Sequence, residues 1–127
     1  MKILLLEPDK ILAQTYAAAL EHAGHAVRHV GNAQAGISAL DNELPDLVIA
    51  ELQLAAHNGI EFLYELRSYT DWQKLPVLIL SIVPPHELGL SLELQQQLGI
   101  AGCHYKPHTR LADMVRSVNQ LPIAQTV

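Results

Sequence analysis

The chain has 127 residues, of which 50% are apolar and 17% charged, so it has the size and composition of one folded domain and is not a disordered tail. Thirteen acids and eight bases give a net charge of −5, which argues against binding to nucleic acid or to an anionic membrane. The single cysteine excludes a disulfide framework. The longest apolar stretch, residues 77–83, is shorter than the roughly 20 residues that span a bilayer, so we expect a cytoplasmic protein.

Short apolar runs recur along the chain, and each is too short to be a helix of its own. They predict strands at residues 3–6, 26–30, 47–50, 77–80 and 100–103. Helical patterns lie between the runs. Regular alternation of strand and helix is typical of a parallel sheet covered by helices on both faces. We therefore expect an α/β domain at residues 2–121, followed by a short tail at residues 122–127.

The helices are marked by periodic apolar residues and by capping signals. In the first helix the period is four, at Leu12, Tyr16 and Leu20. Gly24 signals the end of that helix, and Asn32 can cap the start of the second. The turn signal at residues 58–59 precedes the third helix, and Thr109 can cap the last one.

The fourth connecting helix, at residues 88–98, is unusual because its leucines alternate. We expect about three helical turns after Pro84 and Pro85, with leucines over an arc of roughly 200°, twice the usual buried stripe. One interpretation is a deeply packed helix or a wrong assignment. The other is an exposed apolar ridge that contacts a partner. The leucines concerned are Leu88, Leu90, Leu92, Leu94 and Leu98.

Polar and charged residues follow the predicted strands where each one ends. They are Glu7 and Asp9 after the first strand, Glu51 after the third, Ser81 at the end of the fourth, and Lys106 with Pro107 after the fifth. Parallel sheets bind their ligands at the carboxyl ends of the strands, so these residues should meet in one crevice. Carboxylates, a hydroxyl and an ammonium group suit phosphoryl chemistry with Mg²⁺.

In these features the chain resembles the receiver domain of bacterial two-component response regulators, the CheY-like family, from Lys2 to about Leu121. The matching motifs, in chain order, are EPD, PDLVIAE, NGIEFLYELR, LPVLILS and KP. The resemblance implies a flavodoxin-like, doubly wound sheet of five strands in the order 2-1-3-4-5. It also implies phosphorylation of an Asp after the third strand, with Mg²⁺ held by an acidic pair after the first strand.

The resemblance assigns further roles, residue by residue. Lys106 would pair with the phosphoryl group, and the bond to Pro107 would be cis, as it usually is in the family. Ser81 would turn inward on phosphorylation. The position three residues before the lysine, where an aromatic residue often switches with the hydroxyl, is Cys103.

Two positions depart from the family pattern at the reaction centre. Glu51 replaces the phosphoacceptor Asp, and Pro8 replaces the second acid, which would be a direct metal ligand. Glu reaches about 1.5 Å farther than Asp, and a displacement near 1 Å can cost on the order of 10²-fold in rate. Asp9 could compensate as a metal ligand, or it could simply cap the first helix.

These departures favour a degenerate receiver, or pseudo-receiver, that is not an enzyme and is not controlled by phosphorylation. Glu51 would be a constitutive mimic of the phosphorylated state or simply structural, and Glu7 with Glu51 would be vestiges of a metal site. No cofactor is expected in that case. The alternative is a phosphorelay receiver with residual Mg²⁺-dependent phosphoryl transfer.

Other kinds of site are also possible. His57, His86 and His108 fall in loops beside the expected crevice and could bind a metal or sense pH, although loop histidines are usually solvated. A small-molecule or nucleotide-binding flavodoxin-like protein is a second alternative. Against the nucleotide-binding form, the chain has no GxGxxG after the first strand and no GxxxxGK[ST].

We expect the chain to act by protein–protein contact, with a partner or a second copy. The favoured surface combines the fourth helix with the strand and helix that follow it, and includes Leu90 and Leu94. On that interpretation, Leu90→Asp or Leu94→Asp weakens the contact and leaves the fold intact. No output domain follows within this sequence, so we expect output through a partner or through a domain outside it.

Overall fold

The computed structural model describes residues 1–54 and 59–121. One parallel sheet has the strand order β2-β1-β3-β4-β5, which confirms the predicted flavodoxin-like, doubly wound topology. The strands are β1 (Lys2–Leu6), β2 (Ala26–Val30), β3 (Leu47–Ala50), β4 (Val77–Ser81) and β5 (Ile100–Tyr105). All five predicted strands are present. The turn residue Asn58 and the expected tail at residues 122–127 lie outside the described residues.

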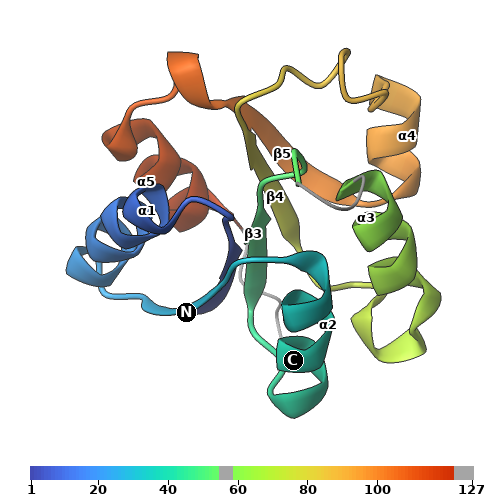
Figure 1. Cartoon of the computed structure of the whole chain (residues 1–127), viewed down its shortest axis with the longest axis horizontal. Coiled ribbons are helices and arrows are strands. Elements are labelled where there is room, and N and C mark those ends of the chain that lie inside the picture. Colours follow the sequence, from blue (N-terminus) through green and yellow to red (C-terminus); the bar gives the residue numbers. More distant parts are fainter. Residues whose placement is uncertain (55–58, 122–127) are drawn as a thin grey trace.

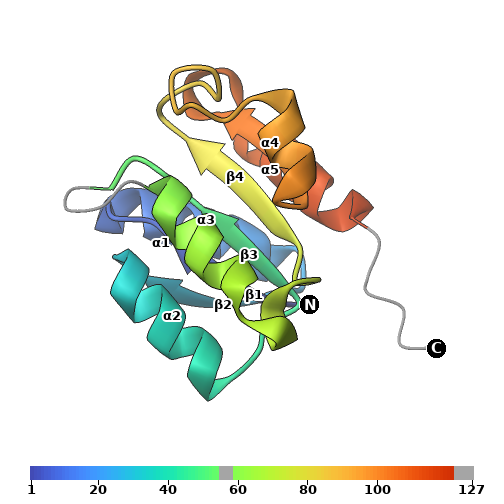
Figure 2. The ribbon, with the colours of Figure 1, turned by 90° about the vertical axis from the view of Figure 1, so that its right-hand side faces the viewer.

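Helices cover both faces of the sheet (Figures 1 and 2). On one face lie α1 (Lys10–His22) and α5 (Leu111–Gln120). On the other lie α2 (Ala33–Asn42), α3 (Gly59–Ser68) and α4 (Leu92–Gln97). Short 3₁₀ helices, η1 (Thr70–Trp72) and η2 (Lys106–His108), follow α3 and β5. Among residues 1–54 and 59–121, no helix is long and apolar enough to cross a membrane.

Alternate side chains of the central strands pack into two separate hydrophobic cores, one on each face of the sheet. In β1, Leu4 and Leu6 pack with residues of α2 and α3, whereas Ile3 and Leu5 pack with residues of α1 and α5. Both faces of the strand are therefore buried, and this is why the strands appear in the sequence as unbroken apolar runs. The carboxyl ends of the strands are held at one edge of this rigid layer.

Two of the predicted caps are present, and a third was assigned to the wrong residue. The Asn32 side chain accepts from the amide of Ala35 at the start of α2, as predicted. Gly24 has φ +98°, which glycine adopts without steric cost, and lies just beyond the Ala23 cap of α1. Thr109 does not cap α5, because its hydroxyl donates to the Tyr105 carbonyl and Arg110 is the cap residue.

The fourth helix differs from the prediction in length and in the position of its leucines. It spans only Leu92–Gln97 and is capped by the Ser91 side chain. Leu90 precedes the helix and is 1% exposed, because the non-helical segment before Ser91 directs it into the core. Leu94 is partly buried against the same core. An exposed ridge through Leu90 and Leu94 is therefore wrong, and Leu92, at 79% exposure, is the exposed leucine of α4.

Candidate functional site

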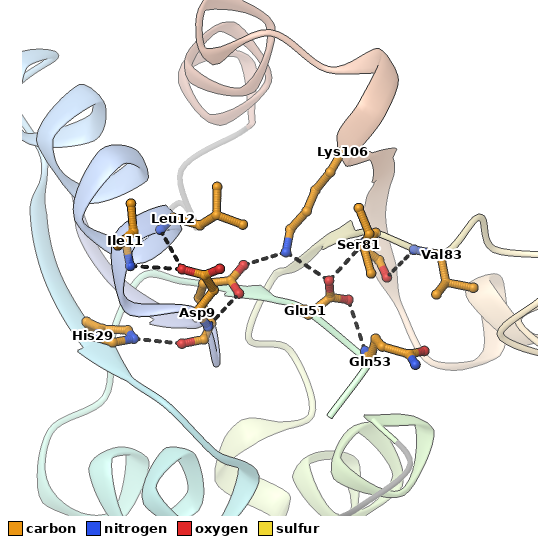
Figure 3. Close-up of polar contacts among 11 residues, drawn as sticks. Asp9, Ile11, Leu12, His29, Glu51, Gln53, Ser81, Val83 and Lys106 are labelled. Carbon is orange, nitrogen blue, oxygen red and sulfur yellow. Dashed lines mark hydrogen bonds and ion pairs between the residues drawn. The ribbon is translucent and has the colours of Figure 1, made fainter. Parts of the chain in front are cut away.

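Side chains from four strand ends meet at one edge of the sheet (Figure 3). Glu7 follows β1, Glu51 follows β3, Ser81 ends β4, and Lys106 begins η2 directly after β5. The first three are 2%, 2% and 1% exposed and are the buried polar residues of the described chain. The structure therefore brings together the residues that the sequence places at these strand ends.

The Lys106 ammonium lies between two carboxylates. Its Nζ is 2.6 Å from Glu7 Oε1 and 2.8 Å from Glu51 Oε1. All three side chains are nearly inaccessible to water, with exposures of 7% for Lys106, 3% for Glu7 and 2% for Glu51. Burial alone would lower the pKa of Lys106, but its hydrogen bonds to Glu51 and Glu7 raise the pKa above the ordinary value. Lys106 is therefore a fixed cation shared by two buried anions.

Backbone amides complete the surroundings of Glu51. The Gln53 amide donates to Oε2 and the Ile82 amide donates to Oε1, both at 2.9 Å. Burial acts to raise the pKa of Glu51, but hydrogen bonds from Gln53, Lys106, Ser81 and Ile82 outweigh it and lower the pKa. Glu51 is therefore ionised at neutral pH, and both of its oxygens are engaged.

The hydroxyl of Ser81 faces this cluster and does not point to solvent. It accepts a hydrogen bond of 3.1 Å from the Val83 amide and lies close enough to the Glu51 carboxylate to help lower its pKa. Ser81 is almost fully buried. The hydroxyl is therefore turned inward beside an ionised but unphosphorylated side chain.

Glu7 is held by the start of α1. Its Oε2 accepts from the Asp9 amide at 3.0 Å. The Asp9 side chain is engaged separately, because its Oδ1 accepts from the amides of Ile11 and Leu12 at 2.9 and 3.1 Å. Asp9 therefore caps α1, which is one of its two predicted roles.

Three features near the crevice were missed by sequence reasoning. His29, on the edge strand β2, donates from Nε2 to the Glu7 carbonyl at 2.8 Å (Figure 3). Tyr16, part of the four-residue period of α1, also lies near these charges. Burial raises the pKa of its phenol, and charges on Lys106 and Glu7 act on it as well. The amides that bind Glu51 are the third feature. The amides could not be predicted because a backbone donor is present at almost every residue, whatever its side chain. The role of His29 could not be predicted because its hydrogen-bond partner depends on the fold.

The segment after β3 is brought close to the start of α3 by Gly59. The Gly59 amide donates to the Leu52 carbonyl at 3.1 Å, and a Cβ on Gly59 would lie 2.4 Å from the Leu52 Cα. No larger residue fits without movement of the backbone. This contact helps to hold the chain immediately after Glu51.

The β5 end departs from the family pattern at two positions. The peptide bond between Lys106 and Pro107 is trans, not cis. Cys103, at the family's aromatic position, is partly buried against the core on the α2–α4 side, and burial raises its pKa to about 11. Cys103 is thus a small packing residue here and not an aromatic switch.

The donor set does not fit Mg²⁺ in this arrangement. The space between Glu7 and Glu51 is bridged by the Lys106 ammonium, and the remaining oxygens accept from backbone amides. Pro8, at the position of the second acid, offers no side-chain oxygen. A hard cation that needs several oxygen ligands would have to displace Lys106 first.

The histidine alternative has no geometric support in the described part of the chain. No group of three or more His, Cys, Asp or Glu side chains there is arranged to hold a metal. The ring of His108 instead makes an edge contact with Tyr105, with 4.9 Å between ring centroids. His57 lies outside the described residues.

Comparison with known proteins identifies the family. The model of the response regulator receiver domain matches residues 3–116, and the chain belongs to this family, the CheY-like signalling modules of two-component systems. Members of the family signal through contacts with other proteins.

Individual relatives agree with this assignment. The KDP operon transcriptional regulatory protein KdpE of Escherichia coli is 33% identical over 79 residues, which are 62% of this chain and 34% of KdpE. The chain spans about a third or less of the curated relatives that it matches. The fold is shared with chemotaxis protein CheY4 of Vibrio cholerae, with TM-score 0.82, 17% identity, and coverage of 95% and 98% of the two chains. It is also shared with a sensor protein from Polaromonas sp. JS666, with TM-score 0.83, 20% identity, and coverage of 94% and 93%.

Proposed function

We propose that this chain is a receiver module whose conformation is set by the Glu51 carboxylate and not by phosphorylation. The observation that carries the proposal is the set of donors to Glu51: the Lys106 ammonium and the amides of Gln53 and Ile82. A phosphoryl group attached after β3 would need a cation and amide donors of the same kind. In this chain the longer side chain of Glu51 brings a fixed negative charge to these donors.

The inward Ser81 hydroxyl supports the constitutive interpretation over a merely structural one. In the family, this hydroxyl is expected to turn inward when the acceptor is phosphorylated. In this chain it is buried beside Glu51 and helps to lower the pKa of that carboxyl without any modification. We therefore assign to Glu51 the role of a built-in mimic of the phosphorylated state.

The contacts of Glu7 and Asp9, near the position where the family binds a metal, support the same proposal. Glu7 is neutralised by Lys106 at 2.6 Å, and Pro8 cannot replace the missing ligand. Asp9 is committed to two amides of α1. We accordingly propose a regulatory module that is not an enzyme and has no resident cofactor.

The module would act by contact with a protein partner or with a second copy of itself. We place the contact on the face formed by α4, β5 and α5, because β5 leads directly into Lys106 and α4 follows the segment that begins with Ser81 and Ile82. Leu92 is the strongly exposed apolar residue of α4. It replaces Leu90 and Leu94 as the residue through which the surface is tested.

The proposal is tested by titrating the protein with Mg²⁺ and beryllofluoride, a phosphoryl analogue, while backbone NMR shifts are recorded. We expect no saturable change at the amides of Gln53 and Ile82. The control is the double variant Pro8→Asp with Glu51→Asp, which restores the acids that the family uses and should respond. A saturable, Mg²⁺-dependent response of the parent chain around Glu51 would favour residual phosphoryl transfer instead.

A further inference from the structure

A second hollow lies far from the crevice, where the strands of the sheet begin. A half-open cavity of about 180 Å³ is bordered by the first residues of β1, by β2, and by the end of α2 with the loop that follows it. Leu4 and Ala39 are buried in its wall, and Pro45 borders it. Figure 2 shows α2 alongside β1 and β2, the elements that frame the cavity. None of the crevice residues contributes to it.

Small side chains account for this space. Ala26 on β2 and Ala39 on α2 both line the cavity, and Ala26 pairs with Lys2 across the β1–β2 ladder. A larger aliphatic residue at either position would fill the gap between helix and sheet, as protein interiors normally do. An engineered apolar cavity of about 150 Å³ holds benzene, so this one has room for a body the size of one aromatic ring.

The Arg28 guanidinium on the cavity wall is available to an anionic ligand. Lys2 is paired with Glu43 at 2.5 Å, so these two charges largely cancel. Arg28 also lines the cavity, and within residues 1–54 and 59–121 its guanidinium makes no hydrogen bond or close ion pair, although its charge helps to lower the pKa of Glu43. The lining includes two bases and one acid, and the Asp46 carboxylate, which accepts from the Lys2 amide at 2.7 Å, lies beside it. Arg28 is suited to a carboxylate because its donors can bind both oxygens at once.

We propose that this cavity is a binding site for a small monocarboxylate with a ring-sized apolar body, held by Arg28 at the mouth and by Leu4 and Ala39 inside. The site would give the module a chemical input that is separate from the crevice. It does not depend on the role of Glu51 and could be correct if that role were disproved.

Benzoate is the probe, titrated into the full chain while backbone amide shifts are followed. A ligand of this size should bind with a Kd on the order of 10 mM. We expect saturable shifts at the amides of Leu4, Ala26, Arg28 and Ala39. Benzamide, which has the same shape without the charge, should bind about three- to fivefold more weakly, as expected for the loss of one exposed ion pair.

Three variants sharpen the test. Arg28→Gln should weaken benzoate binding by about the same three- to fivefold. Lys10→Gln, the matched loss of one charge at the start of α1, should leave binding unchanged. Ala39→Leu should fill the cavity and abolish the shifts. If that variant fails to fold, Arg28→Gln with its control still decides the matter, because Arg28 is exposed.

Several results of these titrations would contradict the proposal. Absence of saturable shifts up to about 50 mM benzoate, several times the expected Kd, would overturn it. So would shifts located away from the cavity. Equal binding of benzoate and benzamide, or no effect of Arg28→Gln, would overturn the assignment to a carboxylate.

Discussion

The Lys106 ammonium donates to two buried carboxylates, so the charge balance of the crevice depends on this one side chain. Removal of one partner from a buried ionic cluster leaves charge that water cannot reach. Such changes typically cost about 3–5 kcal/mol. The triad is thus a structural element as well as a candidate functional one.

We predict that Lys106→Met lowers the free energy of unfolding at pH 7 by about 3–5 kcal/mol, because Glu7 and Glu51 are left unpaired in the interior. Urea denaturation followed by circular dichroism measures the change. Lys10→Met is the control, since an exposed lysine should alter stability by no more than about 0.5 kcal/mol. Equal stabilities of the two variants would show that the triad contributes nothing.

The pH dependence of stability follows from the same group. The folded-state pKa of Glu51 lies below its ordinary value, so its stabilising contribution is present above the unfolded pKa and is lost as pH falls through the folded pKa. The folded pKa of Lys106 is raised, so its contribution is present below its ordinary pKa and is lost as pH rises through the raised value. The free energy of unfolding should therefore change little across neutral pH.

We predict that Glu51→Gln flattens the loss of Tm on acidification, because the group that must take up a proton is gone. Thermal unfolding from neutral pH to about pH 2 measures this, within the range where carboxylates titrate. Some acid sensitivity will remain, since hydrogen bonds from Arg110 lower the pKa of Asp113 to about 2. An acid limb as steep as that of the parent would contradict the assignment to Glu51.

Several residues of the crevice could be predicted from sequence because each follows a strand, and parallel strands end at one edge. The pairing of Lys106 with both acids could not be predicted, since it depends on side-chain reach across three strands. The same holds for His29, whose partner is a backbone carbonyl. The trans bond before Pro107 has no signature in the residue types.

At the scale of elements, the strands were predictable and α4 was not. Burial on both faces makes a strand an unbroken apolar run, whereas alternating leucines suit a helix or an extended segment equally well. The Ser91 side chain caps α4, so Leu90 lies before the helix and Leu92 lies within it. Arg67 on α3 adds a second constraint that the sequence hides, because its guanidinium donates to the carbonyls of Leu98, Gly99 and Trp72.

Leu90 and Leu92 form a matched pair for testing this account of α4. We predict that Leu90→Ala destabilises the fold by about 2–5 kcal/mol, as expected for a buried leucine. Leu92→Ala should change stability by less than about 0.5 kcal/mol. Chemical denaturation of both variants measures the difference. Equal losses of stability would mean that Leu92 is packed in the core as Leu90 is.

The same pair separates the contact surface from the core. Leu92→Asp should leave the circular dichroism spectrum unchanged and weaken any self-association seen by sedimentation. If the variant stays folded and association is unaffected, the α4 face is not the contact between copies. Leu90→Asp cannot serve this purpose, because its side chain is 1% exposed and the change would unfold the protein.

At the scale of the whole molecule, the sheet separates two sites. The crevice lies at the carboxyl ends of the strands and holds a closed set of charges. The proposed carboxylate cavity lies where β1 and β2 begin. In our proposal, Glu51 and Lys106 occupy the phosphoryl site of a receiver fold, and the input would come from elsewhere.

The central claim is that the chain does not need and does not accept a phosphoryl group. Its most direct test is intact-mass spectrometry after incubation with acetyl phosphate and Mg²⁺, for the parent chain and for the Pro8→Asp, Glu51→Asp double variant. The account predicts an unchanged mass for the parent and the added mass of one phosphoryl group for the double variant. A phosphoryl adduct on the parent chain, mapped to Glu51, would contradict it.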